Sequence, residues 1–247
     1  MIRLLALREL RSLFASPSAW FVLGGLQFVL AWIYLVLLER YLDVQPQLAQ
    51  LANPPGVTAS IASPMFNSVA LLLMVATPVF TMRLIAEERR NQTFPLLLAA
   101  PLSDWQIVLG KFCSMLAFLL ISVAGTPLML YTLMLGTHLD HGLMLASLLG
   151  VLLIAASYVA LGLYVSSLTT QPVIAAIGTL AVLLGLWLAD TLASAPDAIW
   201  HALSPFHHFE NLGSGLLDSG DIGFFLLFIF FFIVQTSRRL HHIRRYG

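Results

Sequence analysis

The stretch WFVLGGLQFVLAWIYLVLL, residues 20–38, contains 19 residues without a single charge, and Gln27 is its only amide side chain. At 1.5 Å per residue, an α-helix of this length is roughly 28 Å long, close to the ~30 Å hydrocarbon layer of a bilayer. The run is too long for the apolar part of a signal peptide, and no small-x-small cleavage site directly follows it. It therefore predicts a retained membrane-spanning helix.

Apolar runs of this kind recur along the chain, which has 247 residues, 59% of them hydrophobic and 10% charged. Soluble domains carry roughly 25% charged residues, so this chain lacks the polar surface that water requires. We predict an all-α membrane protein whose single transmembrane domain, 18–237, has spans at about 18–38, 64–85, 108–134, 143–167, 172–190 and 222–237. The sixth span is the shortest and needs local thinning of the bilayer or close packing against its neighbours.

The distribution of lysine and arginine residues between the loops predicts the orientation of these spans. With the N-terminus in the cytoplasm, 11 of the 12 lysine and arginine residues lie at or near the inner face, and only Arg40 lies outside. Both termini are then cytoplasmic, with a basic tail at 238–247, and we expect a multi-pass protein of the bacterial inner membrane. The formal net charge of 0 gives no reason to expect nucleic acid as a partner.

Residues 1–17 form a separate predicted element. At 100° per residue, most apolar side chains of 1–14 fall on one side and Arg8 and Arg11 on the other. This pattern predicts an interfacial amphipathic helix in contact with the inner lipid headgroups, ended by Ser16-Pro17. The alternative is a cytoplasmic extension of the first span.

The loop between the second and third spans reads MRLIAEERRNQTFPLLLAAPLSDWQIVLGKF, residues 82–112. Thr93 is suited to N-cap a short helix that ends near Pro101. Ser103 and Gln106 fit a capping box at the start of the third span. The short helix displays apolar side chains that require lipid or a groove on another protein: Phe94, Leu96, Leu97 and Leu98.

This loop resembles the first cytoplasmic loop of the ABC type-2 permease family. The resemblance lies in Ile85-Ala-Glu-Glu-Arg89, Thr93, Leu96-Leu-Leu98, Pro101-Leu-Ser-Asp-Trp105 and Leu109-Gly-Lys-Phe112. The chain departs from the family at Asn91-Gln92, where a glycine commonly precedes the threonine. Two further motifs resemble the gliding-motility-type branch: Arg8-Glu-Leu-Arg11 with Phe14, Ser16 and Pro17, and Leu203-Ser204 with His208-Phe-Glu-Asn211, Gly215-Leu-Leu-Asp218 and Asp221.

The resemblance implies a permease subunit that pairs with a second permease, as a homodimer or a heterodimer. Each permease would dock a coupling helix, Phe94 to Ala100, onto a soluble ABC ATPase present in two copies. ATP and Mg would bind to that partner, and no cofactor is implied for this chain. The implied ATPase-coupling residues are Glu87, Glu88, Arg89, Thr93, Phe94, Leu96, Leu97, Leu98 and Pro101.

Gly110-Lys111 does not form a P-loop. That motif needs a glycine five residues before this pair and a serine or threonine after it, where Trp105 and Phe112 stand. We therefore expect no nucleotide site and no catalytic residues in this chain, and energy must come from a partner.

The predicted spans contain almost no ionisable side chains, which argues against a proton- or sodium-coupled transporter. Uncharged polar residues either line a pathway or pack the helices together. These candidates are Gln27, Asn67, Ser68, Thr77, Ser122 and Thr126.

An outward-facing group of His201, His207, His208 and Glu210, with Asp218 and Asp221, suggests metal ligands. Its spacing matches no closed ligand set, so we expect polar residues on a solvated loop and no metal site. Whether this loop binds anything stays open. The single cysteine excludes an intrachain disulfide.

Two functions fit these observations. The first is an exporter permease that moves an unidentified substrate with ATP hydrolysed by a separate subunit. The alternative is a non-transporting membrane scaffold or assembly factor that uses the same kind of ATPase to act on a periplasmic partner. A membrane enzyme would need a catalytic constellation that the sequence lacks.

Overall fold

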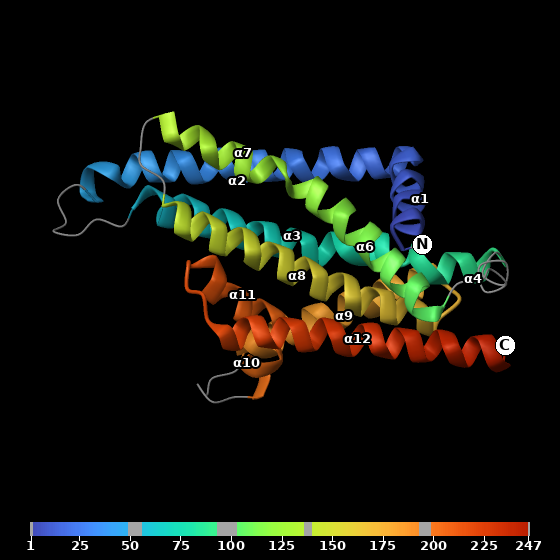
Figure 1. Ribbon diagram of the computed structural model, residues 1–247. Coiled ribbons are helices and arrows are strands. Elements are labelled where there is room, and N and C mark those ends of the chain that lie inside the picture. The colour runs from blue at the N-terminus through green and yellow to red at the C-terminus, as the bar shows by residue number, and fades with distance from the viewer. Residues whose placement is uncertain (1, 49–55, 93–102, 136–139, 193–198, 247) are drawn as a thin grey trace.

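The computed structural model describes residues 2–48, 56–92, 103–135, 140–192 and 199–246. Within these ranges the chain is helical and has no strand. Six of the helical segments are long and apolar enough to cross a membrane (Figure 1). The predicted fold class, an all-α protein with six membrane-spanning helices, is confirmed.

The six long segments are built from α-helices with some short irregular turns. They are α2 (Pro17–Leu48); α3 (Ser63–Thr81), with the π-helical turns η1 (Thr58–Ala62) and η2 (Arg83–Glu87) and the short α4 (Glu88–Arg90); α6 (Asp104–Val123), with α7 (Gly125–Tyr131) and η3 (Thr132–Leu135); α8 (His141–Leu168); α9 (Pro172–Leu192); and α12 (Ser219–Tyr246). The described ranges contain three other helices, α1 (Ile2–Ala15), α10 (Ile199–Leu203) and α11 (Pro205–Gly213).

Several helices extend beyond the predicted spans. The first continues past residue 38 to Leu48, and the sixth continues past residue 237 to Tyr246. Hydropathy marks only the part of a helix that fits the hydrocarbon layer, whereas the internal backbone hydrogen bonds of a helix continue equally well in water. The basic segment 238–246 is therefore a helical extension of the last span.

Helix α8 is the centre of the bundle and packs against α3, α6, α9, α11 and α12. Its close approach to α3 depends on Gly162, because a Cβ atom at this position would collide with the side chain of Thr81. Small residues serve the same purpose in membrane bundles generally, where they let helix backbones approach one another.

The bundle has two distinct ends. At one, the terminal end, lie α1, α4 and the C-terminal part of α12; α10, α11 and the start of α8 lie at the opposite end (Figure 1). Helix α1 turns away from the axis of α2 at Ser16, where Trp20 Nε1 donates a hydrogen bond of 2.8 Å to the carbonyl oxygen of Phe14. The predicted position of α1 in the headgroup layer stays a prediction.

Three long helices, α2, α9 and α12, have extensively exposed apolar faces. Large side chains on these faces include Phe21, Phe28, Trp32, Ile174, Ile177, Leu227, Phe230 and Phe231. Such faces require a non-aqueous neighbour, either lipid or another membrane protein.

Candidate functional site

The predicted coupling helix lies outside the described residues, as do Thr93, Phe94, Leu96, Leu97, Leu98 and Pro101. The structure does describe the two segments that flank it. Both lie at the terminal end, where α4 leads into residues 93–102 and α6 leads out of them.

The start of α6 has the predicted capping box. Ser103 Oγ accepts a hydrogen bond of 3.3 Å from the backbone N–H of Gln106. Gln106 Oε1 accepts one of 3.2 Å from the backbone N–H of Ser103. Both bonds satisfy donors that the first turn of a helix leaves free, so the start of α6 is well defined.

A buried lysine joins three segments at this end. Lys111, on α6, is 0% exposed. Its Nζ lies 2.6 Å from Glu88 Oε1 on α4 and 3.2 Å from Glu9 Oε1 on α1. Burying an ammonium group is costly unless carboxylates surround it, and here two of them do. We call Glu9, Glu88 and Lys111 the buried ion cluster.

Gly110 lets α1 lie close to α6 beside the buried ion cluster. A Cβ atom at this position would lie 2.6 Å from Leu5 Cδ2, so a larger residue would force the Leu5 side chain to shift. The Gly110-Lys111 pair therefore has a packing role and a charge-pairing role.

The segment before the loop is also attached to α8. In the π-helical turn η2, the backbone N–H groups of Ile85 and Ala86 both donate to Ser166 Oγ, over 3.2 and 3.0 Å. Arg89 Nη1 donates to the carbonyl oxygen of Ser167 over 3.0 Å. Glu87 lies on the exposed side, with its Oε2 4.0 Å from Arg83 Nε. Of the three predicted charged coupling residues, Glu88 and Arg89 thus contact other helices, and Glu87 faces outward.

Gln92 ends the described segment with a φ of 56°, in the left-handed region. Its backbone N–H donates to the carbonyl oxygen of Arg89 over 3.3 Å, which closes the last helical turn. Glycine is the usual residue in this conformation at the end of a helix. At this same position the sequence departs from the family that it resembles, because glutamine stands where glycine commonly precedes the threonine.

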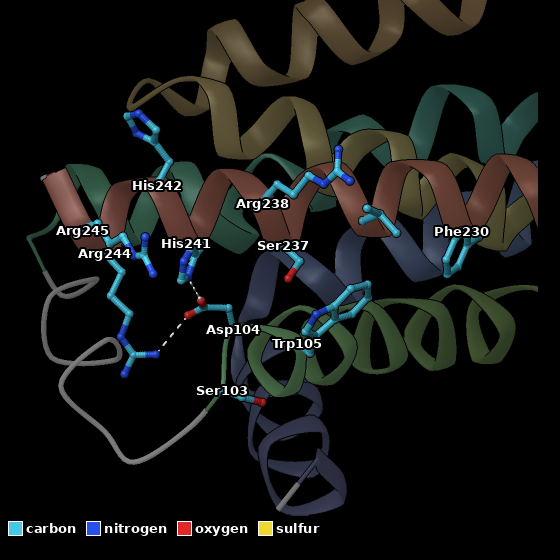
Figure 2. Close-up of a pocket in the computed structure, with 11 residues that line it drawn as sticks. Ser103, Asp104, Trp105, Phe230, Ser237, Arg238, His241, His242, Arg244 and Arg245 are labelled. Atoms are coloured by element: carbon cyan, nitrogen blue, oxygen red, sulfur yellow. Dashed lines mark hydrogen bonds and ion pairs between the residues drawn. The ribbon is translucent and has the colours of Figure 1, made fainter.

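An open pocket of about 1140 Å³ lies between the start of α6 and the end of α12 (Figure 2). Asp104 lies on one side of it, 3.1 Å from His241 Nδ1 and 3.0 Å from Arg244 Nη1. These contacts tie the helical extension of α12 to the first turn of α6. The remaining lining residues are Ser103, Trp105, Phe230, Val234, Ser237, Arg238, His242 and Arg245.

The predicted pathway residues divide into two groups. Gln27, Ser68 and Ser122 form hydrogen bonds to backbone carbonyls, and Gln27 Nε2 donates to the carbonyl oxygen of Ser122 over 2.6 Å. The other three bury side-chain oxygens that have no hydrogen-bond partner within the described part of the chain: Asn67, Thr77 and Thr126. The contacts of the first group are those of helix packing, and a pathway role stays a prediction for all six.

The prediction of a solvated loop at the opposite end is wrong, because the histidines lie on two short helices. His201 is on α10, and His207 and His208 are on α11. His201 Nδ1 lies 2.5 Å, and His207 Nδ1 3.4 Å, from the same oxygen of Asp190 on α9. The sequence did not indicate that Asp190 lies beside these histidines, because Asp190 ends the predicted span 172–190 and the histidines follow that span.

His208 belongs to a second group. Its Nδ1 lies 2.6 Å from Asp221 Oδ1, and Asn211 Nδ2 donates to Asp221 Oδ2 over 3.0 Å. This group joins α11 to α12. Burial raises the pKa of Glu210 on α11, the charge of Asp190 raises it further, and His207 partly offsets both.

Local geometry also accounts for the motif that precedes α12. Ser204 Oγ accepts from the backbone N–H of His207 at the start of α11. Gly215 has a φ of 89°, a conformation that glycine tolerates best. Asp218 Oδ1 accepts from the backbone N–H of Gly220 over 3.0 Å at the start of α12.

Sequence reasoning missed the pairing of Glu9, Glu88 and Lys111. Each of the three residues lies in one of the motifs that resemble the ABC type-2 permease family. Their presence in these motifs was the one feature of the sequence that could have pointed to a common role. Ser166 and Ser167, which bind the segment before the loop, carried no such signal.

Among curated proteins, no sequence matches the chain. A family model described as ABC-2 family transporter protein matches residues 6–231, which include all the described spans except the C-terminal part of α12. With this match and six helices able to cross a membrane, the chain belongs to the ABC-2 family of membrane transporter proteins.

Proposed function

We propose that the chain is the permease subunit of an ATP-binding-cassette exporter in the bacterial inner membrane, of the gliding-motility type. It pairs with a second copy of itself and receives energy from two copies of a separate ATPase subunit. Family membership and the six spans support a permease role. The absence of a P-loop motif from the sequence supports a separate ATPase.

The buried ion cluster is the observation that carries the coupling proposal. Glu88 lies just before residues 93–102 and Lys111 just after them, so one ammonium group connects both sides of the loop. Glu9 adds α1 to this connection, and the bond from Arg89 to Ser167 adds α8. A displacement of the loop is therefore transmitted to four segments at once.

The exposed apolar faces of α2, α9 and α12 support a second permease as neighbour. In the proposed mechanism, ATP binding closes the ATPase pair, and the coupling helix passes this motion to the buried ion cluster. The helices attached to the cluster then shift relative to the second permease, which alternates access to a pathway between the two copies.

The test replaces the two predicted apolar anchors, Phe94 and Leu97, by alanine in one variant. Interface energy is concentrated in a few well-packed anchors, so we expect loss of the ATPase from the purified complex and loss of stimulated hydrolysis. The spans should still insert, because neither residue belongs to one.

A matched control is the double alanine variant of Leu216 and Leu217, which are 64% and 62% exposed at the opposite end. This control should retain both the bound ATPase and its stimulated activity. Normal ATPase recovery and normal hydrolysis in the Phe94→Ala, Leu97→Ala variant would show that these side chains rest on lipid and would refute the proposal.

A further inference from the structure

Three potential metal ligands converge at the opposite end of the bundle from α4 and the buried ion cluster. They are Asp190 on α9, His201 on α10 and His207 on α11. One oxygen or nitrogen from each lies within 4.8 Å of the other two. No two of these residues share a helix, so the tertiary fold creates the cluster.

One ligand distance in this cluster suits a small tetrahedral ion, and a second is shorter. Zinc binds imidazole nitrogen and carboxylate oxygen at about 2.0–2.2 Å, so two ligand atoms at a tetrahedral angle lie about 3.4 Å apart. His207 Nδ1 and Asp190 Oδ1 are separated by 3.4 Å. His201 Nδ1 is closer, at 2.5 Å from that oxygen, as expected for a direct hydrogen bond. To admit an ion, this ring must move by about 1 Å, a distance within reach of a small side-chain rotation.

The chemistry of the cluster favours a transition metal over calcium or magnesium. Imidazole ligands suit zinc, copper and nickel, whereas the hard cations prefer all-oxygen sites. A zinc site with three protein ligands leaves the fourth position open to water. His207 is 40% exposed, so water can reach this side of the cluster. Asp190, in contrast, is 10% exposed, so its carboxylate lies where water screens its charge poorly.

The surrounding structure fixes the directions of the ligands. Ser204 caps α11 by accepting a hydrogen bond from the backbone N–H of His207, and Pro205 occupies the first turn, so the start of the helix that carries His207 is well defined. Phe206 packs edge-to-face against Trp187 on α9, with ring centroids 6.4 Å apart, and this holds α11 beside the helix that carries Asp190. This packing holds the three ligand residues close together before an ion binds.

We infer that Asp190, His201 and His207 bind one divalent transition-metal ion, with zinc as the best match to the ligand set. The ion ties the end of α9 to α10 and α11. This inference does not depend on the proposed transport function, because metal binding is a property of the isolated chain.

The experiment uses the full chain in detergent, purified through a tag without histidines and stripped with a chelator. After equilibration with Zn²⁺ and gel filtration, we expect one zinc ion per chain by elemental analysis. His201→Ala and His207→Ala should each lower the zinc affinity by more than the roughly 10–100-fold typical of outer-shell substitutions. Zinc should also raise the melting temperature of the wild-type chain and leave that of these variants unchanged.

His208→Ala is the matched control, because His208 is adjacent in sequence on the same helix but pairs with Asp221. It should bind zinc with wild-type affinity. Asp190→Asn is a near-isosteric second variant that keeps a hydrogen-bonding side chain beside His201, so its loss of zinc would not reflect misfolding. Absence of zinc from the wild-type chain, or equal affinity in the wild type and His207→Ala, would overturn the inference.

Discussion

Replacing Lys111 with methionine tests the buried ion cluster most directly. Methionine fills similar space but removes the ammonium group that lies 2.6 Å from Glu88 and 3.2 Å from Glu9. Two carboxylates would then face each other across an apolar side chain. We expect a marked loss of stability and, with it, a loss of the connection between α1, α4 and α6.

The magnitude follows from burial and geometry. A hydrogen bond to a charged group contributes about 1.5–3 kcal/mol, and breaking a fully buried ion pair costs about 3–5 kcal/mol. The glutamate side chains are 21% and 25% exposed, so water screens part of the interaction. We therefore expect a loss of about 2–4 kcal/mol, which corresponds to a fall of about 4–16 °C in melting temperature for a chain of this size.

Thermal melting of the purified protein in detergent, followed by gel filtration, measures this effect. Arg83→Met is the matched control, because Arg83 forms a 4.0 Å contact with Glu87 in which both side chains are more than 40% exposed. Such a pair contributes about 0–1 kcal/mol. Adding Glu9→Gln and Glu88→Gln to Lys111→Met should recover part of the loss, because the like charges are then gone. A melting temperature of Lys111→Met equal to that of Arg83→Met would refute the reasoning.

Further predictions concern backbone strain, packing, topology and nucleotide binding. Gln92→Gly should raise the melting temperature by about 2–4 °C, because a left-handed residue other than glycine costs roughly 1 kcal/mol; Gln92→Ala, which keeps a Cβ, should bring no gain. Gly162→Ala should destabilise the bundle by about 1–3 kcal/mol through its collision with Thr81, whereas Gly185→Ala, with open space around it, should melt like the wild type. A topology reporter fused to the C-terminus should report the cytoplasm, and one inserted between α9 and α10 the periplasm; the reverse result at either place would contradict the orientation. The purified chain without its ATPase should show no saturable ATP binding in equilibrium dialysis, and measurable saturation would contradict the assignment of ATP to a partner.

The sequence was sufficient to predict the spans because hydropathy over some 20 residues is a strong and local signal. The capping box of Ser103 and Gln106 was predictable for the same reason, since its two residues are neighbours on one helical turn. Helix ends were harder to predict, and α12 continues to Tyr246 because nothing in its sequence stops the backbone hydrogen bonding at the membrane surface.

Contacts between distant residues could not be predicted from local patterns. Lys111 is separated by 102 residues from Glu9 and by 23 from Glu88, and neither separation belongs to a local motif. Asp190 precedes His201 by 11 residues, and only the packing of α10 beside the end of α9 brings the two side chains together. Both clusters depend on how helices pack, which a single sequence does not specify.

The helical extension of α12 has a practical consequence for fusion proteins. Through Asp104 it is fastened to the first turn of α6, so the C-terminus leaves the bundle beside the segment that follows the coupling loop. A fluorescent protein or bulky affinity tag joined there by a short linker would occupy the space in which we propose that the ATPase docks. The same tag inserted between α11 and α12, at the opposite end, would leave that approach clear.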